Sequence, residues 1–97
     1  KVFELVQDGV HQGYIITSPA TDQDILFDKR WHFNGDFERP TFSPSMLVQY
    51  PEDHPETGHV REHFFVRDGK IEYLTDCHHD MRGKTVDMID CKWGERL

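Results

Sequence analysis

The sequence predicts a mainly β protein, folded as a compact antiparallel sandwich or open barrel of about six or seven short strands. Short runs of alternating apolar and polar residues recur along the chain, separated by Gly, Pro, Asn-Gly and Asp-Gly turn signals. No stretch shows the longer period of an amphipathic helix. Apolar residues make up only 36% of the 97 residues, but seven Phe, three Tyr and two Trp can build a small core. We therefore expect residues 1–97 to form a single β-rich domain.

The first third of the chain contains several strand candidates. Residues 1–6 alternate in polarity and residues 14–17 favour β structure, so the glycine-containing stretch between them predicts a hairpin. Residues 25–27 could form a strand or a single helical turn. Residues 31–33 alternate large side chains and end at Asn34-Gly35, which is a strong turn signal.

The middle of the chain is dominated by prolines. Residues 39–45 include Pro40 and Pro44, which exclude a regular helix and predict an extended strap or an edge segment. Residues 46–50 follow as a strand, and residues 51–58 form an acidic loop.

The clearest hairpin joins residues 61–67 to residues 70–76 through the turn Asp68-Gly69. A two-residue turn pairs Val66 with Ile71 and Phe64 with Tyr73, and it places these four side chains on one core face. A polar segment follows, and residues 85–89 form the last expected strand.

Charge and cysteine content limit the possible roles of the chain. The formal net charge is −7, from 18 acidic and 11 basic residues, which argues against direct binding of nucleic acid. No apolar run approaches the roughly 20 residues that span a bilayer, so no membrane association is expected. Two cysteines are too few for a secreted disulfide scaffold, so a cytoplasmic protein is expected. A core this small makes a homodimer possible.

The residues that favour metal chemistry lie at the two ends of this hairpin. Glu62 and His63 lie on its first strand, and Cys77 and His79 follow its second, so the turn brings thiolate, imidazole and carboxylate donors together. This donor set predicts a zinc or other transition-metal site. In the two-residue register, however, Glu62 and Cys77 share a face while His63 points to the other, so a shared site needs a bulge. The alternative is a His-rich surface with Cys77 as a small buried apolar residue.

Nucleophilic catalysis has weaker support in the sequence. Ser43 and Ser45 could act as nucleophiles, but no local signature surrounds them. A pair of Cys77 with His63 or His79 is conceivable. Asp76 could orient an imidazole, or it could cap the turn. The sequence therefore leaves open whether the chain is an enzyme and favours a non-catalytic role.

Two blocks of the chain resemble a known family. The first reads Trp31-His32-Phe33-Asn34-Gly35-Asp36 and Arg39-Pro40-Thr41-Phe42-Ser43-Pro44-Ser45; the second reads Glu62-His63-Phe64-Phe65-Val66-Arg67-Asp68-Gly69-Lys70-Ile71, Asp76-Cys77-His78-His79 and Gly83-Lys84-Thr85-Val86. They are similar to a family of small uncharacterised phage and prophage proteins with a domain of unknown function, some of which are mislabelled as ammonia monooxygenase. The resemblance implies a metal site at positions 62, 63, 77 and 79, with Glu62 as an oxygen ligand where relatives carry Cys. Relatives also carry a Cys-rich element that is missing around residues 17–24 here.

Three functions are compatible with these features. The first is a phage or prophage accessory protein with a structural, zinc-like metal site that stabilises the small core. The second is an acidic binding module that inhibits a host protein, such as a bacterial defence complex. The third is a metal-dependent hydrolase with an open coordination position for water.

Overall fold

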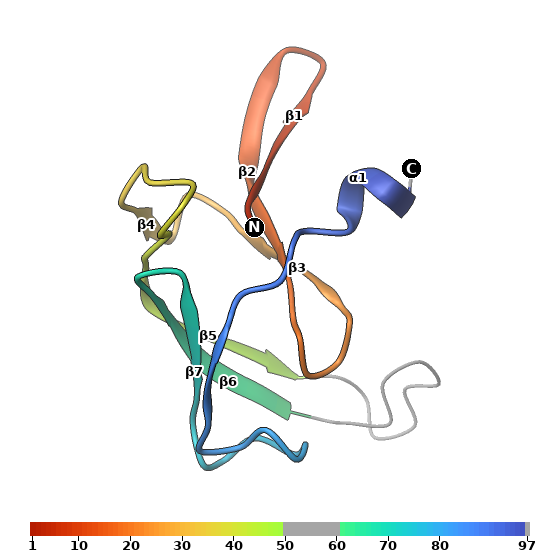
Figure 1. Cartoon of the computed structure of the whole chain (residues 1–97). Coiled ribbons are helices and arrows are strands. Elements are labelled where there is room, and N and C mark those ends of the chain that lie inside the picture. The colour runs from red at the N-terminus through yellow and green to blue at the C-terminus, as the bar shows by residue number, and fades with distance from the viewer. Residues whose placement is uncertain (50–60, 97) are drawn as a thin grey trace.

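Eight strands and one short helix make up the part of the chain described by the computed structural model, residues 1–49 and 61–96. The elements are β1 (Phe3–Gln7), β2 (Val10–Thr17), β3 (Asp24–Phe27), β4 (His32–Phe33), β5 (Phe42–Gln49), β6 (Arg61–Arg67), β7 (Lys70–Tyr73), β8 (Thr85–Asp87) and α1 (Trp93–Arg96). They form two antiparallel sheets with the orders β1-β2-β3 and β4-β5-β6-β7-β8 (Figure 1). The predicted mainly β class is confirmed, with no closed barrel. The expected six or seven strands become eight, and the helix α1 was not predicted.

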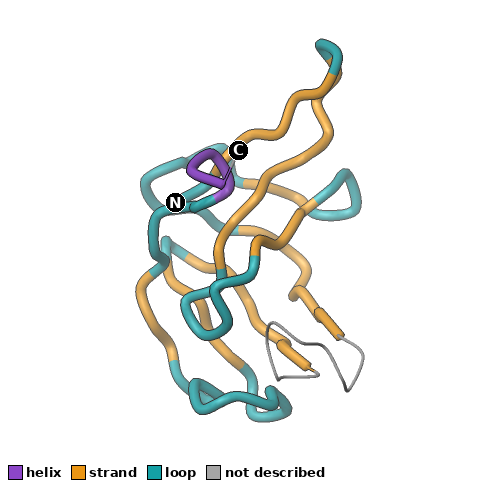
Figure 2. The backbone as a smooth tube through the Cα atoms, turned by 90° about the vertical axis from the view of Figure 1, so that its right-hand side faces the viewer, coloured by secondary structure: helices purple, strands orange, loops and turns teal. Residues whose placement is uncertain are grey.

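The first sheet begins with the predicted hairpin. Strand β1 pairs with β2 from Phe3, opposite Ile15, to Gln7, opposite Val10, with a bulge between Leu5 and Val6. The tip of this hairpin extends away from the rest of the molecule (Figures 1 and 2). Strand β3 pairs with β2 on its other side, so residues 25–27 form a strand rather than a helical turn.

The β6–β7 hairpin has the predicted register. Phe64 lies opposite Tyr73 and Val66 opposite Ile71, and all four side chains are buried. The turn residues Asp68 and Gly69 have φ values of 51° and 77°, which fit a two-residue hairpin turn with both central residues in the left-handed region. The second strand ends earlier than predicted, at Tyr73 rather than residue 76.

Strand β5 differs most from the sequence prediction. It begins at Phe42, so the second half of the predicted strap over residues 39–45 and the predicted strand from residue 46 form one continuous strand. Phe42 lies opposite Val66 and Met46 opposite Phe64, so four steps along β5 match two steps along β6. This bulge leaves Pro44 outside the β5–β6 ladder, where its missing N–H costs no ladder hydrogen bond. The Ser43–Pro44 peptide bond is cis.

Both sheets contribute to one hydrophobic core. Its buried members include Ile16, Ile25 and Phe27 from the first sheet and Phe42, Met46, Phe64, Val66, Ile71 and Tyr73 from the second. The cysteines Cys77 and Cys91 are free thiols. No helix of the described residues is long and apolar enough to cross a membrane. The predicted acidic loop over residues 51–58 lies outside the described residues.

Candidate active site

Three polar side chains of the second sheet and the segment after β7 form a chain of contacts in space. The Oγ atom of Ser45 lies 3.2 Å from Nε2 of His63, and Nδ1 of His63 lies 3.1 Å from Oδ2 of Asp76. The imidazole therefore bridges a hydroxyl and a carboxylate through its two ring nitrogens. A serine hydroxyl, an imidazole and a carboxylate in this order form the nucleophile, base and orienting group of a serine hydrolase.

The sheet register explains why Ser45 and His63 meet. Leu47 lies directly opposite His63 in the β5–β6 ladder. Side chains two residues apart on a strand share a face, so Ser45 is a diagonal neighbour of His63 on that face. Regular pairing with β6 resumes at Met46, so Ser45 is the last residue of the bulge.

Asp76 reaches the imidazole from the segment that follows β7. The hairpin pairing continues past the end of β7, because the Leu74 N–H donates to the His63 carbonyl at 2.9 Å. The chain then turns back toward β6, where the His78 N–H donates to the Arg61 carbonyl at 2.9 Å. Asp76 lies in this turn, so its carboxylate is held beside His63.

The Asp76 carboxylate has two basic neighbours. The His63 hydrogen bond, and next to it the positive charge of Arg61, lower the pKa of Asp76 below its ordinary value. The guanidinium Nη2 of Arg61 lies 3.2 Å from the same oxygen, Oδ2, that faces His63. An ionised Asp76 requires a proton on Nδ1 of His63, which leaves Nε2 free to accept the hydroxyl proton of Ser45.

Cys77 fixes the backbone of His63 rather than its ring. The Cys77 thiol donates to the His63 carbonyl oxygen at 3.1 Å, and its sulfur accepts the His63 N–H at 3.2 Å. Burial raises the pKa of the Cys77 thiol, which keeps it protonated at neutral pH. A protonated, buried thiol is a poor nucleophile, so the alternative pair of Cys77 with a histidine has little support in the geometry.

The three side chains remain accessible from solvent. Ser45 is half-buried, and the side chains of His63 and Asp76 are 25% and 42% exposed. A substrate can therefore reach the hydroxyl, while the sheet behind it holds the backbone of both strands. The arrangement can perform nucleophilic attack with general-base assistance.

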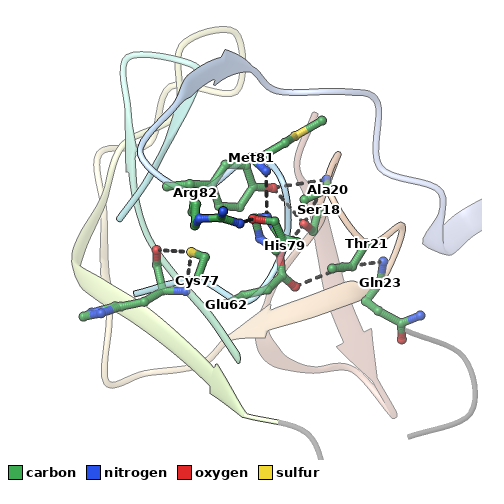
Figure 3. A network of polar contacts seen from close by, with 11 residues as sticks. Ser18, Ala20, Thr21, Gln23, Glu62, Cys77, His79, Met81 and Arg82 are labelled. Atoms are coloured by element: carbon green, nitrogen blue, oxygen red, sulfur yellow. Dashed lines mark hydrogen bonds and ion pairs between the residues drawn. The ribbon is translucent and has the colours of Figure 1, made fainter. Parts of the chain in front are cut away.

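A second polar cluster lies on the opposite side of β6, inside the protein. The Glu62 carboxylate accepts hydrogen bonds from the hydroxyls of Ser18 (2.6 Å) and Thr21 (2.9 Å), and Nε2 of His79 lies 3.3 Å from its Oε1. The Tyr73 hydroxyl lies 2.8 Å from Oγ of Ser18. Figure 3 shows Ser18 and Thr21, from the loop after β2, and His79, from the segment after β7, gathered around Glu62. The cluster therefore joins the two sheets.

This buried cluster contains another serine, carboxylate and histidine, but its geometry is unsuited to catalysis. Ser18 and Glu62 are 0% exposed and His79 is 3% exposed, so a substrate has no access to them. Ser18 donates its proton directly to the carboxylate, and no imidazole accepts it. Nδ1 of His79 accepts the Met81 N–H at 3.2 Å, which places the ring proton on Nε2, toward Glu62. We interpret the cluster as a buried structural network.

The four residues predicted as metal ligands divide between these two places. Glu62 and His79 lie together in the buried cluster, whereas His63 points to the other face with Ser45 and Asp76. Cys77 contacts the main chain of His63. The described residues contain no group of three or more His, Cys, Asp or Glu side chains arranged to hold a metal ion. Metal binding itself stays a prediction.

A cavity of about 640 Å³ lies between residues of β2, β3, β4 and the start of β5. Its lining includes Tyr14, Phe27, Trp31, Phe33 and Phe42, and none of the three bridged residues belongs to it. Its link to the site is one hydrogen bond, in which the Trp31 indole N–H donates to the Ser45 carbonyl at 3.3 Å.

All three site residues are among the candidates named from the sequence, with His63 as a metal ligand and with Ser45 and Asp76 in minor roles. Ser45 was set aside because no local signature surrounds it, and Asp76 was considered as an orienting group for a metal ligand. The pairing of β5 with β6 was the missing information, since it joins residues 18 positions apart. The opposite orientations of Glu62 and His63, which the hairpin register predicted, were a usable signal that the polar residues form two sites.

A comparison with known protein families gives a match. The model of a family described as bacterial ubiquitination-like system serine protease (BubE) matches residues 17–74, which is more than half of the chain. The matched range contains Ser45 and His63, and Asp76 lies two positions beyond it. No curated protein and no solved structure matches the chain.

The family match corrects the functional predictions made from the sequence. A serine protease family conflicts with a non-catalytic accessory protein built around a structural metal, and with a module that only inhibits a host factor. The metal-dependent hydrolase has no support either. The metal-based predictions grouped the hairpin residues in one site, whereas the fold places Glu62 beside His79 and His63 beside Asp76, on two faces of β6. The match supports a bacterial family and does not test the expected phage origin or the label linking relatives to ammonia monooxygenase.

Proposed function

Because the chain belongs to the BubE family, described as the serine protease of a bacterial ubiquitination-like system, we propose that it hydrolyses peptide bonds with Ser45, His63 and Asp76. The observation that carries this proposal is the unbroken contact from hydroxyl to imidazole to carboxylate, with distances of 3.2 and 3.1 Å. We further propose that the substrate is a protein of such a ubiquitination-like system, because the family is described by membership in one.

Acylation begins with the Ser45 hydroxyl. Its Oγ attacks the carbonyl carbon of the substrate while Nε2 of His63 accepts the hydroxyl proton. The tetrahedral intermediate collapses when the C–N bond breaks, and His63 returns the proton to the leaving amine. The products of this half-reaction are a free amine and an ester of Ser45.

Deacylation repeats the same proton transfers with water. His63 takes a proton from a water molecule, the resulting hydroxide attacks the ester carbonyl, and Oγ of Ser45 leaves with the proton held on Nε2. Throughout, Asp76 keeps the Nδ1 proton facing itself and stabilises the imidazolium that forms in each transition state. Arg61 also holds the Asp76 carboxylate, at the same oxygen that faces His63.

Covalent labelling tests the nucleophile directly. A fluorophosphonate reacts with serines that an adjacent base activates, so the intact protein should gain one label, which peptide mass mapping should place on Ser45. Ser45→Ala should abolish the label and His63→Ala should reduce it by at least about a hundredfold, the usual contribution of a general base.

Two control measurements distinguish Ser45 from the other candidate nucleophiles. Ser43→Ala is the matched control, because Ser43 lies two residues from Ser45, is exposed and contacts no part of the site. Its labelling should equal that of the unmodified chain. A label on Ser18, or a reaction that a thiol reagent blocks at Cys77, would refute the assignment of Ser45.

A further inference from the structure

One edge of β5 has main-chain hydrogen-bonding groups that point away from its sheet, close to Ser45. Leu47 lies opposite His63 and Gln49 opposite Arg61 in the β5–β6 ladder. In an antiparallel pair, two opposite residues either exchange both of their main-chain hydrogen bonds or exchange none. The direction in which the β6 residues point therefore determines the direction of their partners on β5.

His63 and Arg61 of β6 direct their main-chain groups away from β5, toward the segment that follows β7. The His63 N–H donates to the Cys77 sulfur and its carbonyl accepts from the Leu74 N–H. The Arg61 carbonyl accepts from the His78 N–H. These residues therefore form non-hydrogen-bonded pairs with β5. Consequently the N–H and C=O of Leu47 and Gln49 point away from β6, toward the outer edge of β5.

No other strand of the described residues occupies that edge beside Leu47. The neighbour of β5 on this side is β4, which consists of His32–Phe33 and pairs only with Ser43 and Phe42. Figure 1 shows β4 at the start of β5, with the remainder of β5 extending past it. Of the outward-facing groups, the Ser45 carbonyl accepts the Trp31 indole N–H. Leu47 then presents one donor and one acceptor two residues beyond the nucleophile.

The side chains along this edge are unusual for an unpaired strand. Exposed edges in soluble proteins are commonly protected by a charge, a proline or a bulge. Residues 46–49 are Met-Leu-Val-Gln, which carry no charge and no proline, and the bulge ends before them. Leu47 is 45% exposed and shares a face with His63. An apolar, unprotected edge beside a nucleophile fits an edge that pairs with substrate.

We propose that the substrate binds as an extended, unfolded segment that adds a strand to the outer edge of β5, with its main chain paired to Leu47 and its scissile carbonyl at Ser45. This inference rests on the proposed peptidase function and specifies its substrate class as a flexible tail or linker rather than a folded surface. Strand addition gives affinity through main-chain hydrogen bonds and leaves side-chain recognition to the flanking residues. Leu47 provides an apolar contact for one substrate side chain.

The test uses the full chain and peptides methylated on single amide nitrogens. A peptide that the chain cleaves and Ser45→Ala does not cleave is first selected from a library of unstructured peptides. Each amide of that peptide is then methylated in turn, which removes one donor. A strand paired to Leu47 points every second amide toward β5, so kcat/KM should fall about tenfold or more at alternate positions, the loss expected for one hydrogen bond. The isomer methylated at the neighbouring amide is the matched control.

A protein variant tests the same contact from the other side. Leu47→Pro removes the outward N–H at a position outside the β5–β6 hydrogen bonds, whereas Leu47→Ala keeps the N–H and removes the side chain. Relative to the rate of fluorophosphonate labelling, kcat/KM for the peptide should fall about tenfold more in Leu47→Pro than in Leu47→Ala.

The outcomes distinguish the inference from the function on which it rests. Labelling of Ser45 together with alternating sensitivity to methylation supports both. Labelling of Ser45 without cleavage of any unstructured peptide, or with equal sensitivity at neighbouring amides, overturns strand addition and leaves the peptidase assignment intact. Absence of labelling at Ser45 overturns the proposed function and this inference with it.

Discussion

Removal of the Glu62 carboxylate should destabilise the fold strongly without removing the nucleophile site. Glu62 is fully buried, and its two oxygens contact Ser18, Thr21 and His79 at 2.6, 2.9 and 3.3 Å. Glu62→Ala leaves the hydroxyls of Ser18 and Thr21 without their acceptor in the interior. A buried polar group that loses its partner costs about 1–3 kcal/mol, so the two together should cost about 2–6 kcal/mol.

The expected loss is a large share of the total stability. A chain of this length has a free energy of unfolding of about 5–15 kcal/mol. A loss of about 2–6 kcal/mol should lower Tm by at least about 8 °C, since 1 kcal/mol corresponds to about 4–8 °C for a small domain. Glu62→Gln keeps one acceptor and should lie between Glu62→Ala and the unmodified chain.

Urea unfolding followed by tryptophan fluorescence measures this change, because Trp31 and Trp93 lie in different parts of the chain. Glu72→Ala is the matched control: Glu72 lies on β7 and pairs with the exposed Arg67, and exposed ion pairs contribute little. A Glu62→Ala variant as stable as Glu72→Ala would refute the structural interpretation of the buried cluster. Loss of fluorophosphonate labelling in a folded Glu62→Gln variant would instead place Glu62 in the catalytic machinery.

Three further predictions concern the nucleophile site and the core. The pKa of Asp76 in the folded protein is lowered from 3.8, so its stabilising contribution is present above that pH and is lost as the pH falls below it. The difference in free energy of unfolding between the unmodified chain and Asp76→Asn, measured by urea unfolding, should therefore vanish in strong acid. A difference that stays constant with pH would contradict the assignment. Iodoacetamide should alkylate the half-buried Cys91 faster than the buried Cys77 in the folded protein, and mass spectrometry over time would expose the opposite order. Phe64→Ala, at a fully buried site, should cost about 3–5 kcal/mol in denaturant unfolding, and a loss under 1 kcal/mol would mean that the core repacks.

The sequence predicted the β6–β7 hairpin down to its register. Asp68-Gly69 specifies a two-residue turn, and the alternation of apolar residues on both sides allows only one pairing that buries Phe64 and Ile71. The same alternation places Glu62 and His63 on opposite faces. These features depend on neighbours in sequence, and local residue patterns determine them.

The tertiary structure alone decided which polar residues meet. Ser45 joins His63 because β5 pairs with β6 across residues 50–60 and because a bulge resets the register between Phe42 and Met46. The alternation of apolar residues does not specify a bulge, and a shift of one residue would turn Ser45 to the other face. Likewise, Glu62 meets Ser18 only when the two sheets pack together, over a separation of 44 residues. The sequence supplied the chemical groups, and long-range packing divided them between a solvent-accessible site and a buried network.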